Sequence, residues 1–319
     1  MLTVFTPAYN RAHTIGRTYE SLCRQTCKDF EWLIIDDGSS DSTSQLVLSW
    51  IKENNSDNDL QHQQNLHEFE GWCEAGFKIR YIWQENQGMH GAHNTAYRNI
   101  TTELNTCIDS DDWMPDNAVE RIVTFWREHG SERYAGFVGL DATADGKIIG
   151  SKFPESMTET TLSGYYAQGG TGDKKLVYRT DVITKYPEYP LFESERYVGL
   201  AYKYLLIDQD YKLLTLNAPL VTVEYQTDGS SFSMYKQYWN NPRGFAFFRK
   251  TEMQYAPSLK RQFIVCTHYV SSSIISKNWH FVKESPKKLM TILSIPAGLI
   301  LFFVIRHKVK ANQQMRFQN

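Results

Sequence analysis

Three carboxylates stand within four positions of one short stretch, Asp109-Ser110-Asp111-Asp112-Trp113, directly after the strand-like run Leu104–Ile108. Like charges this close repel one another unless a cation or hydrogen-bond donors lie between them, and Mg2+ and Mn2+ take oxygen ligands. The stretch therefore predicts a divalent-cation site. The alternative is a solvated turn that caps the helix opening at Asp116.

A second polar segment, Thr6–Arg11, follows the first strand-like run. Tyr9 is of a type that stacks on a flat base, and Arg11 is of a type that faces a phosphate. As structure alone, Pro7 fixes a turn and Asn10 caps the following helix. Both interpretations stay open.

The second strand-like run ends in Asp36-Asp37, five residues or more ahead of the helix that Ser42 opens. That distance is too long for either carboxylate to cap this helix, so we expect one of them to bind a ligand. A carboxylate can accept the imide N–H of a uracil ring. Helix capping by the neighbouring Ser and Asp residues is the alternative.

A third segment, Glu85–Asn94, places Gly88 at the start of a predicted helix. Amide N–H groups and the helix dipole make such a start an anion site, and His90 or His93 could donate to a phosphate. The spacing does not fit a dinucleotide fingerprint. Structural histidines are the alternative.

The elements that must position these segments alternate in type. We expect strands at Leu2–Phe5, Phe30–Ile35, Lys78–Trp83 and Leu104–Ile108, and helices at Thr14–Thr26, Ser42–Lys52, Gly88–Ile100 and Asp116–His129. This β-α-β-α order favours a parallel sheet covered by helices, whose ligands bind at the carboxyl ends of the strands. Asn54–Gln64 is polar and predicts a surface insertion that runs on towards Gly76.

Taken in order, these segments resemble glycosyltransferase family 2. The motifs PAYNR, QTCKDFEWLIIDDGSSD, NQGMHGAHN and DSDDWMPD cover Leu2 to about Ala118, and KYPEYPLFESERYVG is similar to the acceptor-side segment of bacterial capsule and surface-polysaccharide members. The resemblance implies a GT-A fold, a Rossmann-like and mostly parallel sheet flanked by helices. It also implies inverting sugar transfer from a nucleoside diphosphate, by a hexosyl- or N-acetylhexosaminyltransferase that uses Mn2+ or Mg2+.

The resemblance also implies roles for single residues. Pro7 and Tyr9 would line the nucleoside pocket and Asp37 would read the base, with Asp36, Asn10, Arg11, Gly88, His93 and Asp109 as further nucleotide-binding candidates. Asp111 would ligate the metal together with Asp109. The candidates for the sugars are Asp112 and Asp173. For the catalytic base the resemblance favours Glu195, which precedes an aromatic-Val pair, with Glu193 as the alternative. His93 and Met89 stand where many members have basic residues, so we expect phosphate binding to depend strongly on the metal.

The C-terminal tail differs from the rest of the chain, since the apolar run Leu289–Ile305 is flanked by Lys287, Lys288, Arg306, Lys308 and Lys310. Its length of about 17 residues is at the lower limit for a membrane span. We expect this tail to contact the anionic cytoplasmic leaflet, and a core helix is the alternative. From this contact we expect a lipid-linked saccharide as the acceptor. We also expect the protein to be peripheral at the cytoplasmic face of the cell membrane.

Composition bounds the remaining choices. A net charge of −2 argues against nucleic acid as a partner, and five cysteines without a paired pattern favour the cytoplasm. No signal-peptide pattern precedes Leu2. We expect a catalytic domain over 1–225, with a nucleotide-binding half 1–118 and an acceptor-side half 119–225, then a helical extension 226–286 and the tail 287–319.

Three other classes are weighed against transfer. A sugar-1-phosphate nucleotidyltransferase would need a Gly-rich basic loop after the first strand, where this chain has Pro7-Ala8-Tyr9. A carboxylate hydrolase would consume donor without acceptor, and a non-catalytic binding protein would bind the nucleotide without turnover. The sugar, the nucleotide, the linkage and the oligomeric state stay undetermined at this level.

Overall fold

The computed structural model describes residues 1–51, 67–224 and 234–316, and the chain divides into two compact units. Unit 1 consists of Met1–Glu188 and Leu206–Glu224, and unit 2 of Tyr189–Leu205 and Tyr225–Asn319. Residues 189–205, expected in the acceptor-side half of the catalytic domain, thus group with the C-terminal helices. The expected insertion Asn54–Gln64 and the expected boundary at 225 lie outside the described residues.

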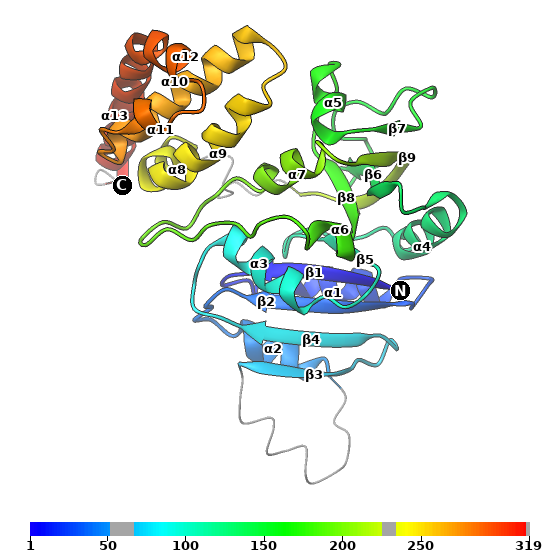
Figure 1. Cartoon of the computed structure of the whole chain (residues 1–319). Helices are drawn as coiled ribbons and strands as arrows, with labels where there is room; N and C mark the ends of the chain where they lie inside the picture. Colours follow the sequence, from blue (N-terminus) through cyan, green and yellow to red (C-terminus); the bar gives the residue numbers. More distant parts are fainter. Residues whose placement is uncertain (52–66, 225–233, 317–319) are drawn as a thin grey trace. The chain divides into compact units, whose positions relative to one another are not determined.

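The described part of unit 1 holds one mixed sheet with flanking helices (Figure 1). Its strands are β1 (Leu2–Ala8), β2 (Phe30–Asp36), β3 (Glu68–Trp72), β4 (Lys78–Trp83), β5 (Leu104–Cys107), β6 (Tyr134–Ala142), β7 (Glu159–Thr160), β8 (Lys174–Arg179) and β9 (Lys212–Thr222). Its helices are α1 (Ile15–Cys23), α2 (Thr43–Ser49), α3 (Met89–Asn99), α4 (Ala118–His129), α5 (Leu162–Ala167) and α6 (Thr180–Ile183), and α7 (Ala201–Ile207) leads from unit 2 back into unit 1.

The strand order is β3-β4-β2-β1-β5-β8-β6-β9-β7. β1, β2, β4 and β5 run parallel, which confirms the predicted order and brings their carboxyl ends to one edge of the sheet. β8 is antiparallel to both β5 and β6. β3 was not predicted, because this exposed strand pairs with β4 at the edge of the described sheet and carries few apolar side chains.

The strands β1 and β2 present different faces to different helices. Leu2, Val4 and Trp32 belong to the main core, which also includes residues of α1, α2 and α4. On the other face, the ring of Phe5 meets those of His93 and Tyr97 of α3, with ring centroids 5.1 and 5.5 Å apart. This alternation fixes which side of the sheet each loop helix covers.

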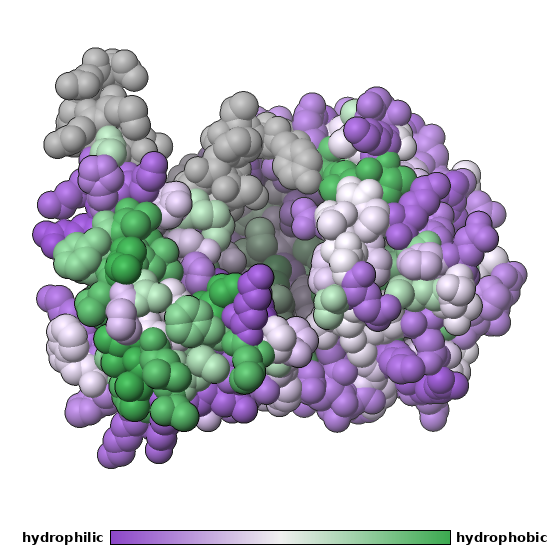
Figure 2. All heavy atoms as spheres, turned by 90° about the horizontal axis from the view of Figure 1, so that it is seen from above, coloured by the Kyte–Doolittle hydropathy of each residue, from purple (hydrophilic) through white to green (hydrophobic). Residues whose placement is uncertain are grey.

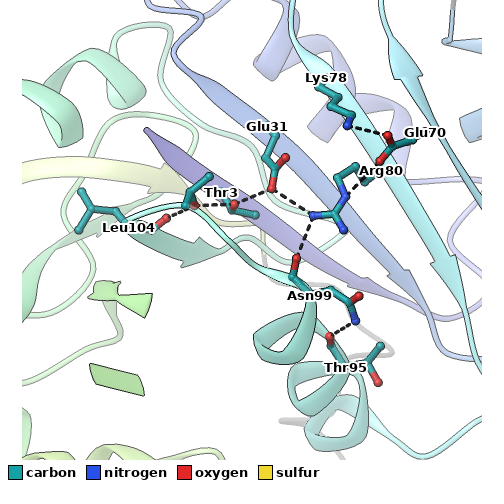
Figure 3. Close-up of polar contacts among 9 residues, drawn as sticks. Thr3, Glu31, Glu70, Lys78, Arg80, Thr95, Asn99 and Leu104 are labelled. Atoms are coloured by element: carbon teal, nitrogen blue, oxygen red, sulfur yellow. Dashed lines mark hydrogen bonds and ion pairs between the residues drawn. The ribbon is translucent and has the colours of Figure 1, made fainter. Parts of the chain in front are cut away.

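A buried polar network ties α3 to the sheet (Figure 3). Glu31 of β2 is 5% exposed, accepts a hydrogen bond from Thr3 Oγ1 at 2.9 Å and pairs with Arg80 of β4 at 3.3 Å. Arg80 also donates to the carbonyl of Asn99, at the end of α3, at 2.9 Å. Because a buried charge is costly unless it is paired, this network holds α3 in one position against the sheet.

Unit 2 is described over α8 (Met234–Asn240), α9 (Pro242–Gln254), α10 (Leu259–Ile275), α11 (Phe281–Glu284), α12 (Lys288–Leu293) and α13 (Ile295–Arg316). Met253, Val265, Cys266 and Tyr269 form its small apolar core. Phe245 of α9 is 3% exposed, so it packs inside. Within the described residues, none of the helices combines the length and the hydropathy needed to cross a bilayer.

Candidate active site

The acidic loop Asp109–Trp113 leaves the carboxyl end of β5 and is fastened to α1. Thr18 Oγ1 donates to the carbonyl of Asp112 at 2.7 Å, and Arg17 Nη2 donates to the carbonyl of Asp111 at 3.2 Å. The Arg17 guanidinium also lies over the Trp113 ring, 5.4 Å from its centroid. The helix that follows β1 therefore holds the backbone of the loop that follows β5.

The same loop is fastened to the end of β9. Trp113 and Thr222 exchange two backbone hydrogen bonds, of 3.1 and 2.7 Å. The N–H of Glu224 donates to Asp112 Oδ1 at 3.4 Å, and Glu224 forms an ion pair with Arg17. These contacts hold the loop from both sides, so its carboxylates are positioned by contacts with remote segments of the chain, α1 and the end of β9.

The carboxylates of the loop differ in burial. Asp109 is exposed and Asp111 is half-buried, whereas Asp112 is only 6% exposed. Burial, then the charge of Asp109, raises the pKa of Asp111 and raises that of Asp112 to about 7. Like charges in a partly desolvated place disfavour ionisation, and a cation would relieve this cost.

Positive side chains already face this negative cluster. Arg11 and Arg17 counteract the rise in the pKa of Asp111, and Lys175 of β8 counteracts that of Asp112. Lys175 Nζ donates to the carbonyl of Cys107, the last residue of β5, at 3.0 Å. Burial alone would lower the pKa of Lys175, but the negative charges around it, with Asp141 first, outweigh burial and raise it.

Asp141 of β6 is a second buried carboxylate of this charge cluster, beside Asp112. It is 4% exposed, and its Oδ1 has no hydrogen-bond partner among the described residues. Burial raises its pKa, while Lys175 opposes the rise. Sequence reasoning missed Arg17, Lys175 and Asp141. The doublet Lys174-Lys175 gave no sign of which lysine faces the site, and Lys174 Nζ instead donates to four backbone carbonyls of the segment 149–173.

The donor set fits a hard divalent cation that is shared with a ligand. Among the described residues, no group of three or more His, Cys, Asp or Glu side chains is arranged to hold a metal by itself. Mg2+ and similar ions are commonly bound by one or two carboxylates, with substrate phosphates and water completing the shell. Asp111 and Asp109 supply carboxylates of this kind at the sheet edge.

Asp37, the predicted reader of the base, is bound inside the protein. It is 4% exposed, and it accepts hydrogen bonds from Gln84 Nε2, from the N–H of Gln87 and from the N–H of Gly88, at 2.6, 2.8 and 2.7 Å. Asp36 accepts from the N–H of Ser39 and from the Tyr81 hydroxyl. The Asp37 carboxylate thus joins the loops after β2 and β4, whereas that of Asp36 bonds to its own loop and to β4, and base reading by Asp37 stays a prediction.

The loop after β1 is linked to the loop after β2 mainly through Asn10. Asn10 adopts a left-handed φ of 54°, and its Oδ1 accepts from the N–H of Ser40 at 2.8 Å. The N–H of Arg11 donates to Thr43 Oγ1 at 3.0 Å. Tyr9 is 51% exposed, so its ring is free to stack on a flat ligand, whereas Pro7 is half-buried within β1.

The predicted phosphate loop is mostly engaged with the protein itself. Gly88 has a φ of 82°, and its N–H donates to Asp37. His93 is 1% exposed, contacts the carbonyl of Met89 through Nδ1 at 2.9 Å and packs against Phe5. These contacts give His93 a packing role, and its burial does not support phosphate binding.

The two base candidates belong to unit 2. Glu195 is 6% exposed; its Oε1 accepts from the N–H and the Nε of Arg243, at 3.0 and 2.9 Å, and its Oε2 accepts from the N–H of Gly244 at 2.8 Å. It therefore caps the start of α9, where a carboxylate is favoured by the helix dipole. The Glu193 side chain is exposed, as is that of Asp173 in unit 1.

Comparisons with known proteins support the resemblance to glycosyltransferase family 2. Residues 3–147 match the model described as glycosyl transferase family 2. The glycosyltransferase GlyA of Streptococcus pneumoniae is 26% identical over 49% of this chain, and an uncharacterized glycosyltransferase of Nostoc is 28% identical over 58%. The chain spans 20% and 52% of the lengths of these two relatives.

A third relative is covered over most of its length. It is the UDP-Glc:alpha-D-GlcNAc-diphosphoundecaprenol beta-1,3-glucosyltransferase WfgD of Escherichia coli, 25% identical over 74% of this chain and 81% of its own. Among solved structures, residues 1–349 of Staphylococcus aureus TarS share the fold, with a TM-score of 0.53 and 16% identity over 98% of this chain and 91% of that one. Residues 3–147, which include the acidic loop, are thus a glycosyltransferase family 2 domain.

Proposed function

We propose that this chain transfers a sugar from a UDP-sugar, with inversion, to a hydroxyl of a lipid-linked saccharide in the synthesis of cell-surface polysaccharide. The observation that carries the proposal is the acidic loop Asp109–Trp113 at the carboxyl edge of a family 2 domain. The lipid-linked acceptor is supported by the activity named for WfgD, the relative covered over most of its length.

The reaction forms a bond between the acceptor oxygen and C1 of the sugar and breaks the bond between C1 and the β-phosphate oxygen. The electron pair of the broken bond goes to the nucleoside diphosphate, and the proton of the acceptor hydroxyl goes to a base. Tyr9, exposed at the edge of the sheet, would stack on the nucleobase.

Asp111, with Asp109, would hold Mn2+ or Mg2+, and the cation would neutralise the charge that grows on the leaving diphosphate. The protein prepares this place by fastening the loop to α1 and β9. Arg11 and Arg17 lie near enough to Asp111 to favour its ionised form. Asp112 and Asp173 remain our candidates for contact with the sugars.

The base must have an oxygen that is free to accept a proton. Of the two candidates, Glu193 fits this need better, because both oxygens of Glu195 already accept hydrogen bonds from Arg243 and Gly244. We therefore expect Glu193→Gln to lower turnover more than it lowers donor binding. Glu195→Gln should instead lower the stability of α9.

We further propose that the protein acts as a peripheral protein at the cytoplasmic face of the cell membrane, where a lipid-linked acceptor would be presented. The support is the tail: Leu289, Leu293 and Ile300 are exposed at 72%, 59% and 67%, beside Lys287 and Lys288. Exposed apolar side chains next to basic ones suit an anionic lipid surface.

A donor screen tests the proposal. The intact chain is mixed with UDP-glucose or UDP-GlcNAc, with Mn2+ or with EDTA, and both binding and donor consumption are measured. We expect binding and consumption only with the cation, and a loss of roughly a hundredfold or more in Asp111→Ala, because removing transition-state charge stabilisation costs several kcal/mol.

Asp145→Ala is the matched control, since Asp145 is an exposed carboxylate in the turn that follows β6. It should behave as wild type. Undiminished donor consumption in EDTA, or in Asp111→Ala, would refute the metal assignment, and binding without any turnover would favour a non-catalytic nucleotide-binding protein.

A further inference from the structure

The helix α12 of unit 2 buries the polar side chain of Thr291 and exposes three of its four apolar side chains. Thr291 is fully buried, whereas Leu289, Ile292 and Leu293 are 72%, 48% and 59% exposed. The buried hydroxyl is satisfied, because Thr291 Oγ1 lies 2.7 Å from Ser285 Oγ. A surface helix in water normally shows the opposite arrangement. The exposed face of α12 is therefore built for an apolar environment.

The helix α13 is apolar on two sides. Gly298 and Ile305 are buried on one side, and a Cβ at Gly298 would lie only 2.5 Å from Val270 of α10, so this side packs closely on α10. On the other side, Ile300 and Phe303 are 67% and 59% exposed. A helix that is apolar all round is normally covered on every side. The second side of α13 lacks such a cover within the described residues.

These side chains belong to one surface with α10, which we call the apolar face. Helix α10 contacts both α12 and α13, so the three helices lie together. Figure 2 shows apolar side chains gathered over the C-terminal helices, with hydrophilic ones at their edge. The exposed members are Leu259, Phe263, Ile264, Leu289, Ile292, Leu293, Leu299, Ile300, Phe303 and Val304, and Trp279 after α10 is 71% exposed.

The segment that carries the apolar face has mainly positive charge. Between residues 256 and 311 the sequence has nine Lys and Arg residues and a single acidic one, Glu284. The basic residues are Lys260, Arg261, Lys277, Lys283, Lys287, Lys288, Arg306, Lys308 and Lys310. The whole chain has a net charge of −2, so the excess of positive charge is local to this segment.

We propose that the apolar face of α10, α12 and α13, with its basic edge, is a docking surface for an anionic lipid bilayer. Apolar side chains would enter the boundary between headgroups and acyl chains, while lysines and arginines contact anionic headgroups. Charge complementarity selects this partner over a second copy of the chain, since two such faces would repel each other. This proposal rests on the membrane part of the proposed function. The bilayer would contact a surface built from three helices, and not the C-terminal tail alone.

Co-sedimentation with vesicles tests the proposal on the full chain. Wild type should bind vesicles of phosphatidylcholine mixed with phosphatidylglycerol, and bind pure phosphatidylcholine at least tenfold more weakly. The double variant Ile300→Ser/Phe303→Ser should weaken binding to the anionic vesicles at least tenfold. Lys287→Ser/Lys288→Ser should remove most of the dependence on phosphatidylglycerol and on salt. Ile300, Phe303 and Lys288 are exposed and Lys287 is half-buried, so the fold should be kept in both variants.

The controls use matched positions in unit 1. Trp72→Ser removes an apolar side chain of similar exposure, 58%, and Lys147→Ser/Lys152→Ser removes two exposed charges; both should bind vesicles as wild type does. Equal binding by wild type and Ile300→Ser/Phe303→Ser would overturn the proposal. So would a wild-type dimer in light scattering that the same variant dissociates. Neither result would change UDP-sugar binding, which tests the donor site separately.

Discussion

Substitution of Asp37 distinguishes a structural role of its carboxylate from the base-reading role that the family resemblance implies. Asp37→Ala would remove three hydrogen bonds and leave the N–H groups of Gln87 and Gly88 without this acceptor. A buried donor left unpaired costs about 1 to 3 kcal/mol. Gly88 is buried and Gln87 is half-buried, so we expect the free energy of unfolding to fall by about 2 to 5 kcal/mol in total.

Urea unfolding, followed by tryptophan fluorescence, measures this change, and UDP binding is measured on the same samples. Asp37→Asn keeps one acceptor oxygen and should lose less stability than Asp37→Ala. Asp145→Ala, in an exposed turn, should change the free energy of unfolding by less than about 0.5 kcal/mol. If Asp37→Ala stays within that margin and yet weakens UDP binding, the carboxylate reads the base and our structural reasoning is wrong.

Three further predictions concern the rest of the fold. Lys175→Met removes a charged hydrogen-bond donor to the carbonyl of the last residue of β5. In urea unfolding it should lower the free energy of unfolding by about 1.5 to 3 kcal/mol, and Lys175→Arg should lower it less. Gly136→Ala should lower the free energy of unfolding by about 1 to 3 kcal/mol or more, because φ is 145° and a Cβ would lie 2.0 Å from a β8 carbonyl. Gly146 has a φ of 81° but lies in open space, so Gly146→Ala should lower it less. Thermal melts of the two variants and wild type measure the difference. Burial, then the charge of Arg249, lowers the pKa of His268 to about 4, so the folded state resists protonation and wild type should lose stability as pH falls from 6.5 towards 4. His268→Gln should lose less over that pH range, and equal losses in the two proteins would contradict the assignment.

The parallel half of the fold could be predicted because each element carries its own period. β2 is buried along its whole length and α1 places Ile15 and Leu22 inside, so the pattern of apolar residues already specifies a covered parallel sheet. β3 escaped prediction since an edge strand that is largely exposed needs few apolar side chains. Its pairing with β4 is decided by the strand partner and not by its own pattern.

Loop position predicted a ligand role for Asp36 or Asp37 and a phosphate contact for His90 or His93, and the family resemblance implied base reading by Asp37; these roles stay predictions. In the structure, Asp37 accepts hydrogen bonds from the protein, and His93 packs under β1. A loop sequence cannot reveal this difference, because a carboxylate that binds a ligand and one that binds a neighbouring loop have the same chemistry. The choice depends on which N–H groups the next loop brings within reach.

The sequence by itself determined the class of the fold, the carboxyl edge at which polar residues gather, and the acidic loop after β5, since these depend on local periodicity and on residue order. Tertiary structure alone decided that Arg17 and Lys175, from segments far apart in the chain, face the carboxylates of that loop. It also decided that α12 turns its leucines outward. Burial and charge pairing depend on distances between residues remote in sequence, and those distances exist only once the chain has folded.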